Sequence, residues 1–126
     1  MRIFTGILSR IFGLFWLVFG LNGLFHFFPI PAPPQESAYF MEALTRSGYA
    51  LPMIYGAEVV VGLMLLMGGW KPLALLLLAP ITANILAYDA MLNPSGLAVG
   101  IVLAAIHAFL LWRSRAAYAP LLECQC

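Results

Sequence analysis

The amino-acid sequence predicts an all-α membrane protein, a four-transmembrane-helix bundle with a short interfacial helix between spans one and two. Hydrophobic residues make up 63% of the 126 residues and charged residues only 9%, whereas a soluble domain has about 45–50% and about 25%. Six basic and five acidic residues are too few to cover the surface of a soluble globule. A net charge of +1 gives no basic footprint for nucleic acid. We therefore expect the lipid bilayer as the solvent and no nucleic-acid partner.

Four apolar stretches are long enough to cross a hydrocarbon core, which takes roughly 20 helical residues. They run over residues 11–28, 50–69, 72–91 and 94–112. Only two acidic residues lie inside them, Glu58 in the second stretch and Asp89 near the end of the third. The stretches do not alternate polar and apolar residues as a transmembrane barrel would. No second domain is indicated, so residues 1–126 are predicted to form a single membrane domain.

The basic residues predict the orientation of the spans. With four spans, both termini and the turn at 68–72 lie on one side of the membrane. That side holds five of the six basic residues, Arg2, Arg10, Lys71, Arg113 and Arg115. The positive-inside rule then places both termini and the tail at 113–126 in the cytoplasm. A signal peptide is the alternative for the N-terminal segment, but the proline-rich sequence after it is a poor cleavage site, which favours an uncleaved first span.

The external loop, residues 29–49, has two parts. Its prolines hold the first part extended. Residues 35–46 contain good helix formers, with Ala38, Met41 and Leu44 at a three-residue spacing, which predicts a short helix on the outer membrane surface. This loop is either a connector or a lid over an outward-facing pocket, and the connector is favoured because long loops need not be lids.

Polar residues of the first three spans are predicted to share one layer in the outer half of the membrane. A rise of 1.5 Å per helical residue places Glu58 roughly 12 Å and Asn84 roughly 9 Å below the outer surface. Spacings of three and four residues put the polar side chains of each span on one helix face. The pairs are Asn22 with His26, Tyr55 with Glu58, and Asn84 with Tyr88.

This layer indicates a pocket for a lipid-soluble ligand. Glu58 and His26 are the candidate catalytic residues, since both can handle a proton. The candidate ligand-binding residues, which would orient a carbonyl or a hydroxyl, are Asn22, Tyr55, Asn84 and Tyr88. A quinone fits this set, because it carries two carbonyls on an apolar ring and gains protons on reduction. The alternative is a hydrogen-bonded clasp between spans, worth only about 0.6 kcal/mol on average; we favour the site for Glu58 and the clasp for the two asparagines.

Other polar residues support weaker hypotheses. His107 on the fourth span is interpreted as a helix-packing hydrogen bonder, and Asp89 is expected to meet headgroups or water. No metal-ligand spacing is present, so no metal is expected. Cys124 and Cys126 could join a thiol relay or bind a soft metal, but a frayed tail is favoured.

Small residues recur every four positions on two spans. They are Gly96, Gly100, Ala104 and Ala108 on the fourth span, and Ala79, Ala83 and Ala87 on the third. Because small residues let helices approach closely, these faces are expected to meet a neighbour in the bundle or in a second copy. They support an alternative function, a non-catalytic membrane partner or assembly scaffold, which includes a homo-oligomer. Trp16, Trp70 and Trp112 are interpreted as membrane anchors, most clearly the last two at span ends.

Several short motifs together resemble the DoxX family of small bacterial membrane proteins. They are the run FGLNGLFHFFP at 19–29, Gly48-Tyr49 with Pro52, Glu58 with Gly62, Pro72, Ala79-Pro80 with Asn84, and Asn93-Pro94 with Gly96. The resemblance covers residues 11–122 and implies a four-helix bundle in the bacterial inner membrane. It also implies a link to redox chemistry, because relatives include the membrane subunit of a thiosulfate:quinone oxidoreductase.

The resemblance further implies a soluble or membrane redox enzyme as partner, with this chain, if it is enzymatic, as a subunit of a membrane oxidoreductase. The family's recurrent intramembrane glutamate and asparagine correspond to Glu58 and Asn84. The Cys-Gln-Cys ending has no counterpart in the family pattern, and no residue marks a thiosulfate site. Thiosulfate is therefore not expected as the substrate.

Overall fold

The computed structural model describes residues 1–30 and 32–123, and all the regular structure within them is helical. The elements are α1 (Arg2–Phe25), α2 (Gln35–Arg46), α3 (Ala50–Met67), α4 (Lys71–Met91), the 3-10 helix η1 (Pro94–Gly96), α5 (Leu97–Arg113) and α6 (Arg115–Leu122). Four segments are long and apolar enough to cross a membrane: Arg2–Phe25, Ala50–Met67, Lys71–Met91 and Pro94–Arg113. The all-α prediction is confirmed, and the chain has the architecture of a multi-pass membrane protein.

The first span differs from its predicted bounds, because α1 begins at Arg2 rather than at residue 11 and ends at Phe25. Polar residues near its start do not interrupt the helix. The hydroxyl of Thr5 donates a hydrogen bond to the carbonyl of Met1 at 2.9 Å, so it stays within the helix it belongs to. At the other end, His26 takes the left-handed conformation with φ 56° and ψ 54°. The chain therefore leaves the helix before the proline at position 29.

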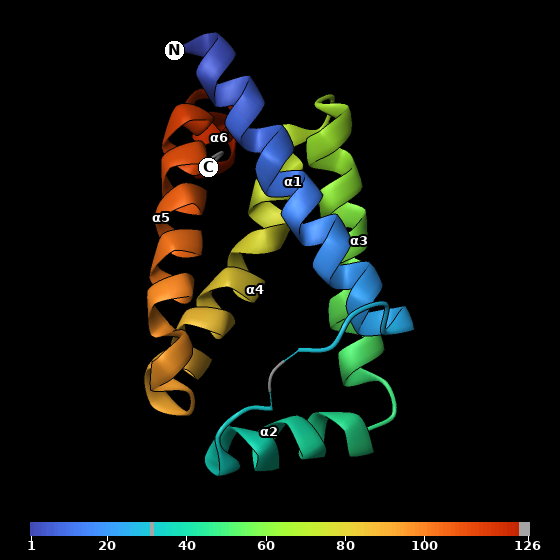
Figure 1. Ribbon diagram of the computed structural model, residues 1–126. Helices are drawn as coiled ribbons and strands as arrows, with labels where there is room; N and C mark the ends of the chain where they lie inside the picture. The colour runs from blue at the N-terminus through green and yellow to red at the C-terminus, as the bar shows by residue number, and fades with distance from the viewer. Residues whose placement is uncertain (31, 124–126) are drawn as a thin grey trace.

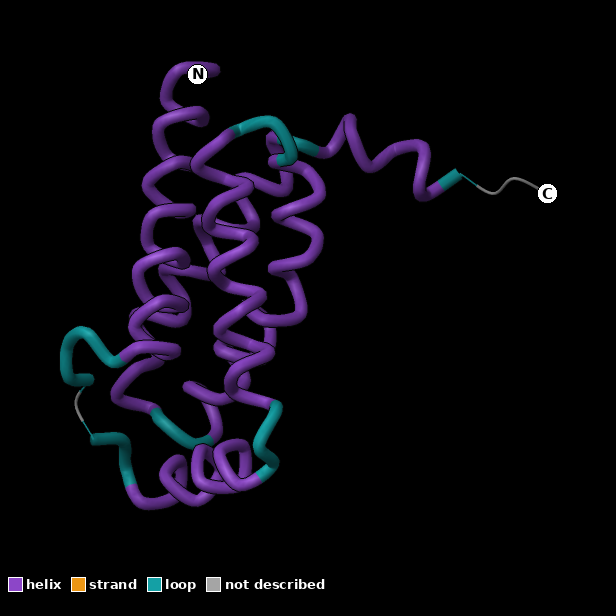
Figure 2. Tube along the Cα trace, turned by 90° about the vertical axis from the view of Figure 1, so that its right-hand side faces the viewer, coloured by secondary structure: helices purple, strands orange, loops and turns teal. Residues whose placement is uncertain are grey.

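The four long helices form two pairs that are close together at one end of the molecule and apart at the other (Figure 1). Helix α1 packs closely along α3, and α4 packs along α5. The N-terminus, the turn between α3 and α4, and α6 lie at the end where the pairs meet (Figures 1 and 2). The N-terminus and α6 thus lie at one end of the bundle (Figures 1 and 2), as expected of a chain with four spans.

The packed hydrophobic core lies between the middle of the bundle and the α3–α4 turn, and we call this part the closed half. Its buried side chains come from all four long helices. They are Phe12, Trp16, Val61, Leu65, Ala74, Leu75, Leu78 and Leu110. Leucine-rich segments of α3 and α4 meet here because the turn at Gly68, which has a positive φ of 80°, reverses the chain over a few residues.

The part of the bundle between the middle and α2 is the open half. Its buried side chains in the described residues are polar: Asn22, Ser37, Glu58 and Asp89. Helix α2 lies across this end, as Figure 1 shows. The ring of Phe40 on α2 packs against Tyr88 on α4, with 5.6 Å between centroids. The predicted short helix at 35–46 is confirmed, and it covers the space between the two helix pairs.

The segment after the last span forms a short helix, α6, which was not predicted from the sequence. Helix α6 is fixed by Tyr118, whose hydroxyl donates a hydrogen bond to the carbonyl of Pro72 at 2.6 Å. The guanidinium of Arg115 lies over the ring of Trp112, 4.6 Å from its centroid. Burial raises the pKa of Tyr118. Cys124 and Cys126 lie outside the described residues, so the thiol hypothesis stays a prediction.

Candidate functional site

The crossing of α1 and α3 sets the position of the candidate site. A Cβ atom on Gly13 would lie 2.6 Å from the Cβ of Leu65, and one on Gly62 would lie 2.6 Å from the backbone nitrogen of Leu17. Only glycine fits at these positions, because the two backbones are in contact. The small-residue faces of the third and fourth spans were expected to meet a neighbour in the bundle or in a second copy. The tightest crossing joins the first and second spans, and no four-residue repeat marks its glycines, which are Gly13, Gly20 and Gly23 on α1 and Gly62 on α3.

Glu58 lies in the middle of α3 at the boundary between the closed and open halves. It is 6% exposed, and its carboxyl group has no hydrogen-bond partner among the described residues. The carboxyl oxygens are not wholly enclosed, since neither is among the fully buried unpaired atoms. Tyr55, one turn further out on α3, is within electrostatic range of Glu58 and Tyr88. The structure therefore brings three of the predicted residues together, from two different spans.

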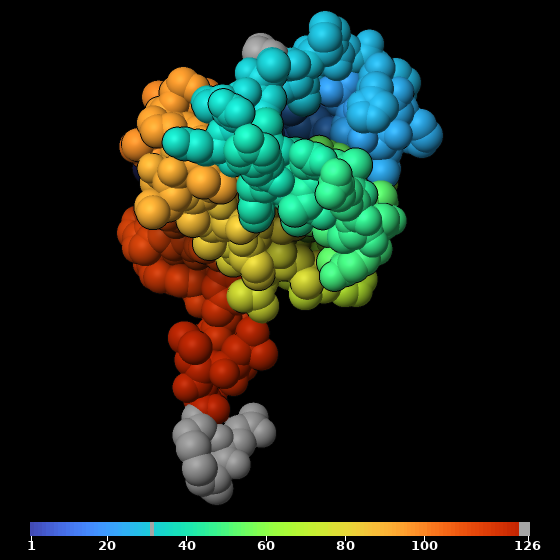
Figure 3. Space-filling view, turned by 90° about the horizontal axis from the view of Figure 1, so that it is seen from below, coloured from blue at the N-terminus to red at the C-terminus, as the bar shows by residue number. Residues whose placement is uncertain are grey.

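His26 and Asn22 lie at the outer end of α1, beyond this group. The Asn22 side chain is buried, and its Oδ1 accepts a hydrogen bond from the backbone N–H of Phe28 at 2.8 Å. It therefore holds the turn after α1, within one segment rather than between spans. His26 is exposed and lines two hollows of about 530 and 340 Å³, and Tyr55 lines both. Figure 3 shows the surface hollowed between α2 and the segment that follows α1.

Asn84 does not join the group around Glu58, because its side chain is exposed on α4. The inner face of α4 is set by Leu78 and Thr82, which are both buried. Asn84 follows Thr82 by two residues, which is about 200° around the helix axis. The depth estimate for Asn84 concerned its level along the span. The direction of its side chain depends on how α4 packs against the neighbouring helices.

Asp89 was expected to meet headgroups or water, and this prediction is wrong. The side chain is 7% exposed and accepts a hydrogen bond on Oδ1 from Nδ2 of Asn93 at 3.1 Å. Two glycines make room for it, since a Cβ on Gly96 would lie 2.9 Å from Oδ1 and one on Gly100 2.7 Å from Oδ2. The small-residue face of α5 thus accommodates a carboxylate of α4. On the third span, Ala83 is exposed, as is Ala87.

His107 serves helix packing, as its position on the small-residue span indicated. It is buried, with Nε2 2.8 Å from the carbonyl oxygen of Leu75 and Nδ1 2.9 Å from the hydroxyl of Thr82. A carbonyl only accepts hydrogen bonds, so Nε2 carries the proton and Nδ1 accepts from Thr82. The two bonds fix a neutral imidazole between α4 and α5.

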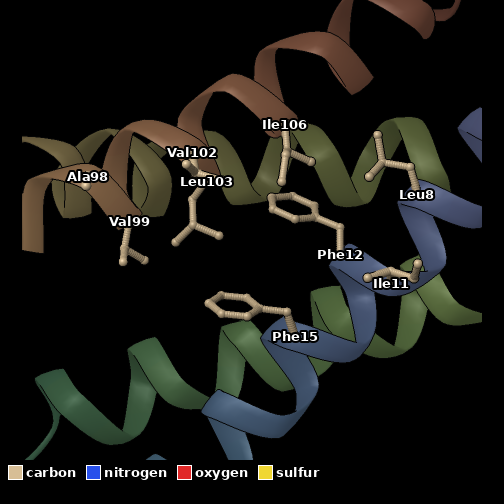
Figure 4. A pocket seen from close by; sticks show the side chains of 9 residues that line it. All are labelled: Leu8, Ile11, Phe12, Phe15, Ala98, Val99, Val102, Leu103 and Ile106. Carbon is tan, nitrogen blue, oxygen red and sulfur yellow. The ribbon is translucent and has the colours of Figure 1, made fainter.

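An apolar groove of about 420 Å³ lies between α1 and α5 (Figure 4). It is lined by Leu8, Ile11, Phe12, Phe15, Ala98, Val99, Val102, Leu103 and Ile106. None of these side chains is polar, so the groove suits a hydrocarbon group. The sequence alone did not reveal it, because it arises from the divergence of α1 from α5 and not from any local pattern.

Trp16 lies directly behind this groove. Its indole packs edge-on against Phe12 and Phe15, with centroids 5.8 and 5.2 Å apart. It is 2% exposed, and its Nε1 is the single fully buried side-chain nitrogen or oxygen without a hydrogen-bond partner in residues 1–30 and 32–123. The interpretation of Trp16 as a membrane anchor is wrong. The sequence already indicated that Trp16 is not an anchor, because it lies in the middle of a span. Anchoring tryptophans are found at the membrane interfaces.

The described residues contain no cluster of three histidine, cysteine, aspartate or glutamate side chains able to hold a metal ion. Comparison with known proteins gives no match, neither to a family model nor to a curated protein nor to a solved structure. Evidence on function therefore comes from the arrangement of four side chains, those of Glu58, Tyr55, Tyr88 and Trp16.

Proposed function

We propose that this protein is a redox-associated membrane component, resembling the DoxX family, which binds a quinone-like lipophilic molecule near Glu58. The observation that carries the proposal is the buried carboxyl group of Glu58, without a partner among the described residues, in the middle of a membrane-spanning helix. A charged side chain at this depth costs about 2.5–3.5 kcal/mol on insertion scales. Intramembrane carboxyl groups that are kept despite this cost usually act on a ligand or a proton.

Each group near Glu58 has a role in the proposed chemistry. A quinone becomes a quinol by taking up two electrons and two protons, and a partner redox enzyme supplies the electrons. Glu58, in its protonated form, donates a hydrogen bond to one carbonyl oxygen and passes it one proton, the second carbonyl oxygen takes its proton from water by way of His26, and the phenols of Tyr55 and Tyr88 bind the ring. His26, which shares its hollows with Tyr55, exchanges protons with water at the outer surface. Asn22 holds the turn that carries His26, and Asn84 does not touch the ligand.

We infer the orientation of the protein in the membrane from the distribution of its positive charges. With both termini in the cytoplasm of a bacterial inner membrane, the open half and α2 face the outside. The quinone then reacts near the outer leaflet, with α2 between the site and external water.

The test is mass spectrometry of quinones that copurify in mild detergent, with a short-chain ubiquinone then titrated into lipid nanodiscs. Three forms are compared: wild type, Glu58→Gln, and Asn84→Gln as a matched control on an exposed position. Wild type and Asn84→Gln should bind quinone equally, and Glu58→Gln should bind it at least tenfold more weakly. The proposal fails if wild type binds no quinone, or if Glu58→Gln binds it as wild type does.

An assembly scaffold is the second candidate, and one observation favours it. The exposed amide of Asn84 lies among the exposed alanines 83 and 87 on the outer face of α4, where a second helix could approach closely. Cross-linking of Ala83→Cys in native membranes should then trap one specific partner, and Ala87→Leu should abolish the product. Val102→Cys on the exposed side of α5 is the control position. Equal cross-linking from both positions would indicate random contact and contradict the scaffold.

A further inference from the structure

The tight crossing of α1 and α3 sets the level of Trp16 relative to Glu58. Trp16 lies between Gly13, which contacts α3 at Gly62, and Gly20, which contacts α3 at Val59. Its level therefore corresponds to residues 59–62 of α3, about one helical turn from Glu58. Both side chains are buried. They consequently face the interior between the helix pairs, at the boundary of the closed and open halves.

Neither of these two side chains has a hydrogen-bond partner among the described residues. The indole Nε1–H only donates hydrogen bonds, and a buried donor left unpaired destabilises the fold. Glu58 does not satisfy it, since no hydrogen bond joins the two among the described contacts. Other buried polar side chains do have partners, such as His107 with Leu75 and Asp89 with Asn93. A third group that offers an acceptor to the indole would complete the site.

The groove between α1 and α5 provides access from the lipid to this position. Phe12 and Phe15 line the groove and also pack against the indole of Trp16. Figure 4 shows the rings of Phe12 and Phe15 on the α1 side, with Val99 and Val102 opposite. The lining residues of α5 run from Ala98 to Ile106, a length of about 12 Å at 1.5 Å per residue. A hydrocarbon substituent fits along it.

We propose that Trp16 is a ligand-binding residue whose Nε1–H donates a hydrogen bond to a carbonyl of the bound molecule, while the molecule's hydrocarbon tail lies in the α1–α5 groove. This rests on the proposed function and specifies its ligand as a lipophilic carbonyl compound with a tail. Trp16 and Glu58 then bind the head from two helices. Phe15, which is only partly buried, is the ring that moves aside to admit the head.

The first experiment uses Trp16 as its own reporter. The double variant Trp70→Phe/Trp112→Phe keeps Trp16 as the fluorophore, and Trp16→Phe/Trp70→Phe keeps the exposed Trp112 as the matched control. Both are titrated with a short-chain ubiquinone in nanodiscs, because quinones quench tryptophan emission at short range. Trp16 emission should be quenched saturably, whereas Trp112 emission should fall in proportion to the quinone dissolved in the lipid. Equal, non-saturating quenching of both would overturn the inference.

The second experiment separates the head from the tail. Trp16→Phe removes the N–H and keeps a ring, and it should weaken quinone binding about tenfold, or about 1.4 kcal/mol. Val102→Trp fills the groove and should weaken binding of a long-tailed quinone but not of a tailless one. Ile101→Trp, exposed and outside the groove lining, is its control and should leave both affinities unchanged.

The outcomes distinguish this inference from the proposed function. If wild type binds quinone through Glu58 but Trp16→Phe and Val102→Trp bind it equally well, the inference is wrong and the proposed function stands. If wild type binds no quinone, both fail. If Trp16→Phe does not fold, the Trp112 control is lost with it, and saturable or non-saturable quenching in Trp70→Phe/Trp112→Phe, together with the Val102→Trp series, decides the matter.

Discussion

The closed and open halves of the bundle are built from the same four helices, but they bury different kinds of side chain. The closed half buries leucine, phenylalanine and tryptophan, and its buried polar groups, such as His107, are paired apart from the indole N–H of Trp16. The open half buries Asn22, Glu58 and Asp89, and Glu58 lacks a partner among the described residues. In lipid the closed half can hold the bundle together through contact alone. In the open half, the unpaired carboxyl group of Glu58 reduces stability.

This division explains how so small a membrane protein can keep a site. The α1–α3 crossing at Gly13 and Gly62 and the α4–α5 bond at His107 fix each pair. The pairs meet at the α3–α4 turn and diverge beyond it (Figure 1). Substitutions at these two helix contacts should therefore change stability, and substitution of Glu58 should abolish binding without loss of stability.

The largest effect is expected at the helix crossing. Gly62→Leu places a side chain where a Cβ alone would be 2.6 Å from the Leu17 nitrogen. It should lower the free energy of unfolding by about 3 kcal/mol, the upper end of the usual cost of overpacking. Gly56→Leu on the same helix, where no atom lies within 4 Å of the added Cβ, is the control. Denaturant unfolding in detergent measures both, and similar losses would refute the tight crossing.

His107→Ala should give the next largest effect. It removes the hydrogen bonds to Leu75 and Thr82, at a cost of about 2 kcal/mol. The control is His26→Asn, because asparagine also tolerates the left-handed conformation and the side chain is exposed. The thermal midpoint of His26→Asn should match wild type. A smaller loss at His107 than at His26 would contradict the division into halves.

Glu58→Met should raise stability while abolishing quinone binding. The change replaces an unpaired buried carboxyl with an apolar side chain of similar length, which should add about 1 kcal/mol to the free energy of unfolding. The comparison with His107→Ala is informative, since both remove a buried polar group but should change stability in opposite directions. A loss of stability in Glu58→Met would mean that the carboxyl group supports the fold rather than a ligand.

The sequence was sufficient to predict the four long apolar helices, because hydropathy and length are local properties. It was also sufficient for α2, where helix formers follow a proline-rich segment. Prediction from the sequence failed where the direction of a side chain depends on a neighbouring helix. The expected depth of Asn84 and Asp89 gave no information on direction, and the packing of α4 turns Asn84 outward and Asp89 inward. Glu58 was identified correctly as buried because a charge in a span is itself unusual, whereas Trp16 is chemically ordinary in an apolar segment.

Asn22→Ala tests whether the outer turn is a structural support of the open half. It leaves the Phe28 N–H without the Oδ1 acceptor at 2.8 Å, which should cost about 1 kcal/mol. Asn22→Asp keeps an acceptor at the same place and should retain most of the stability. Quinone affinity should change little in either variant. A large loss of affinity in Asn22→Asp would instead make Asn22 a ligand-binding residue.

The smallest effect is expected at α6, outside the spans. Burial raises the pKa of Tyr118 above its ordinary value, which is about 10, and the hydroxyl can donate to Pro72 only while it is protonated. Its contribution to stability is present below the pKa of the unfolded chain and is lost as pH rises through the higher folded-state pKa. Tyrosinate absorbance, as the difference between wild type and Tyr118→Phe, should therefore rise at higher pH in folded than in denatured protein. Coincident titrations would show that α6 does not hold Tyr118 against α4, and the Tyr118→Phe variant should then unfold as wild type does at every pH.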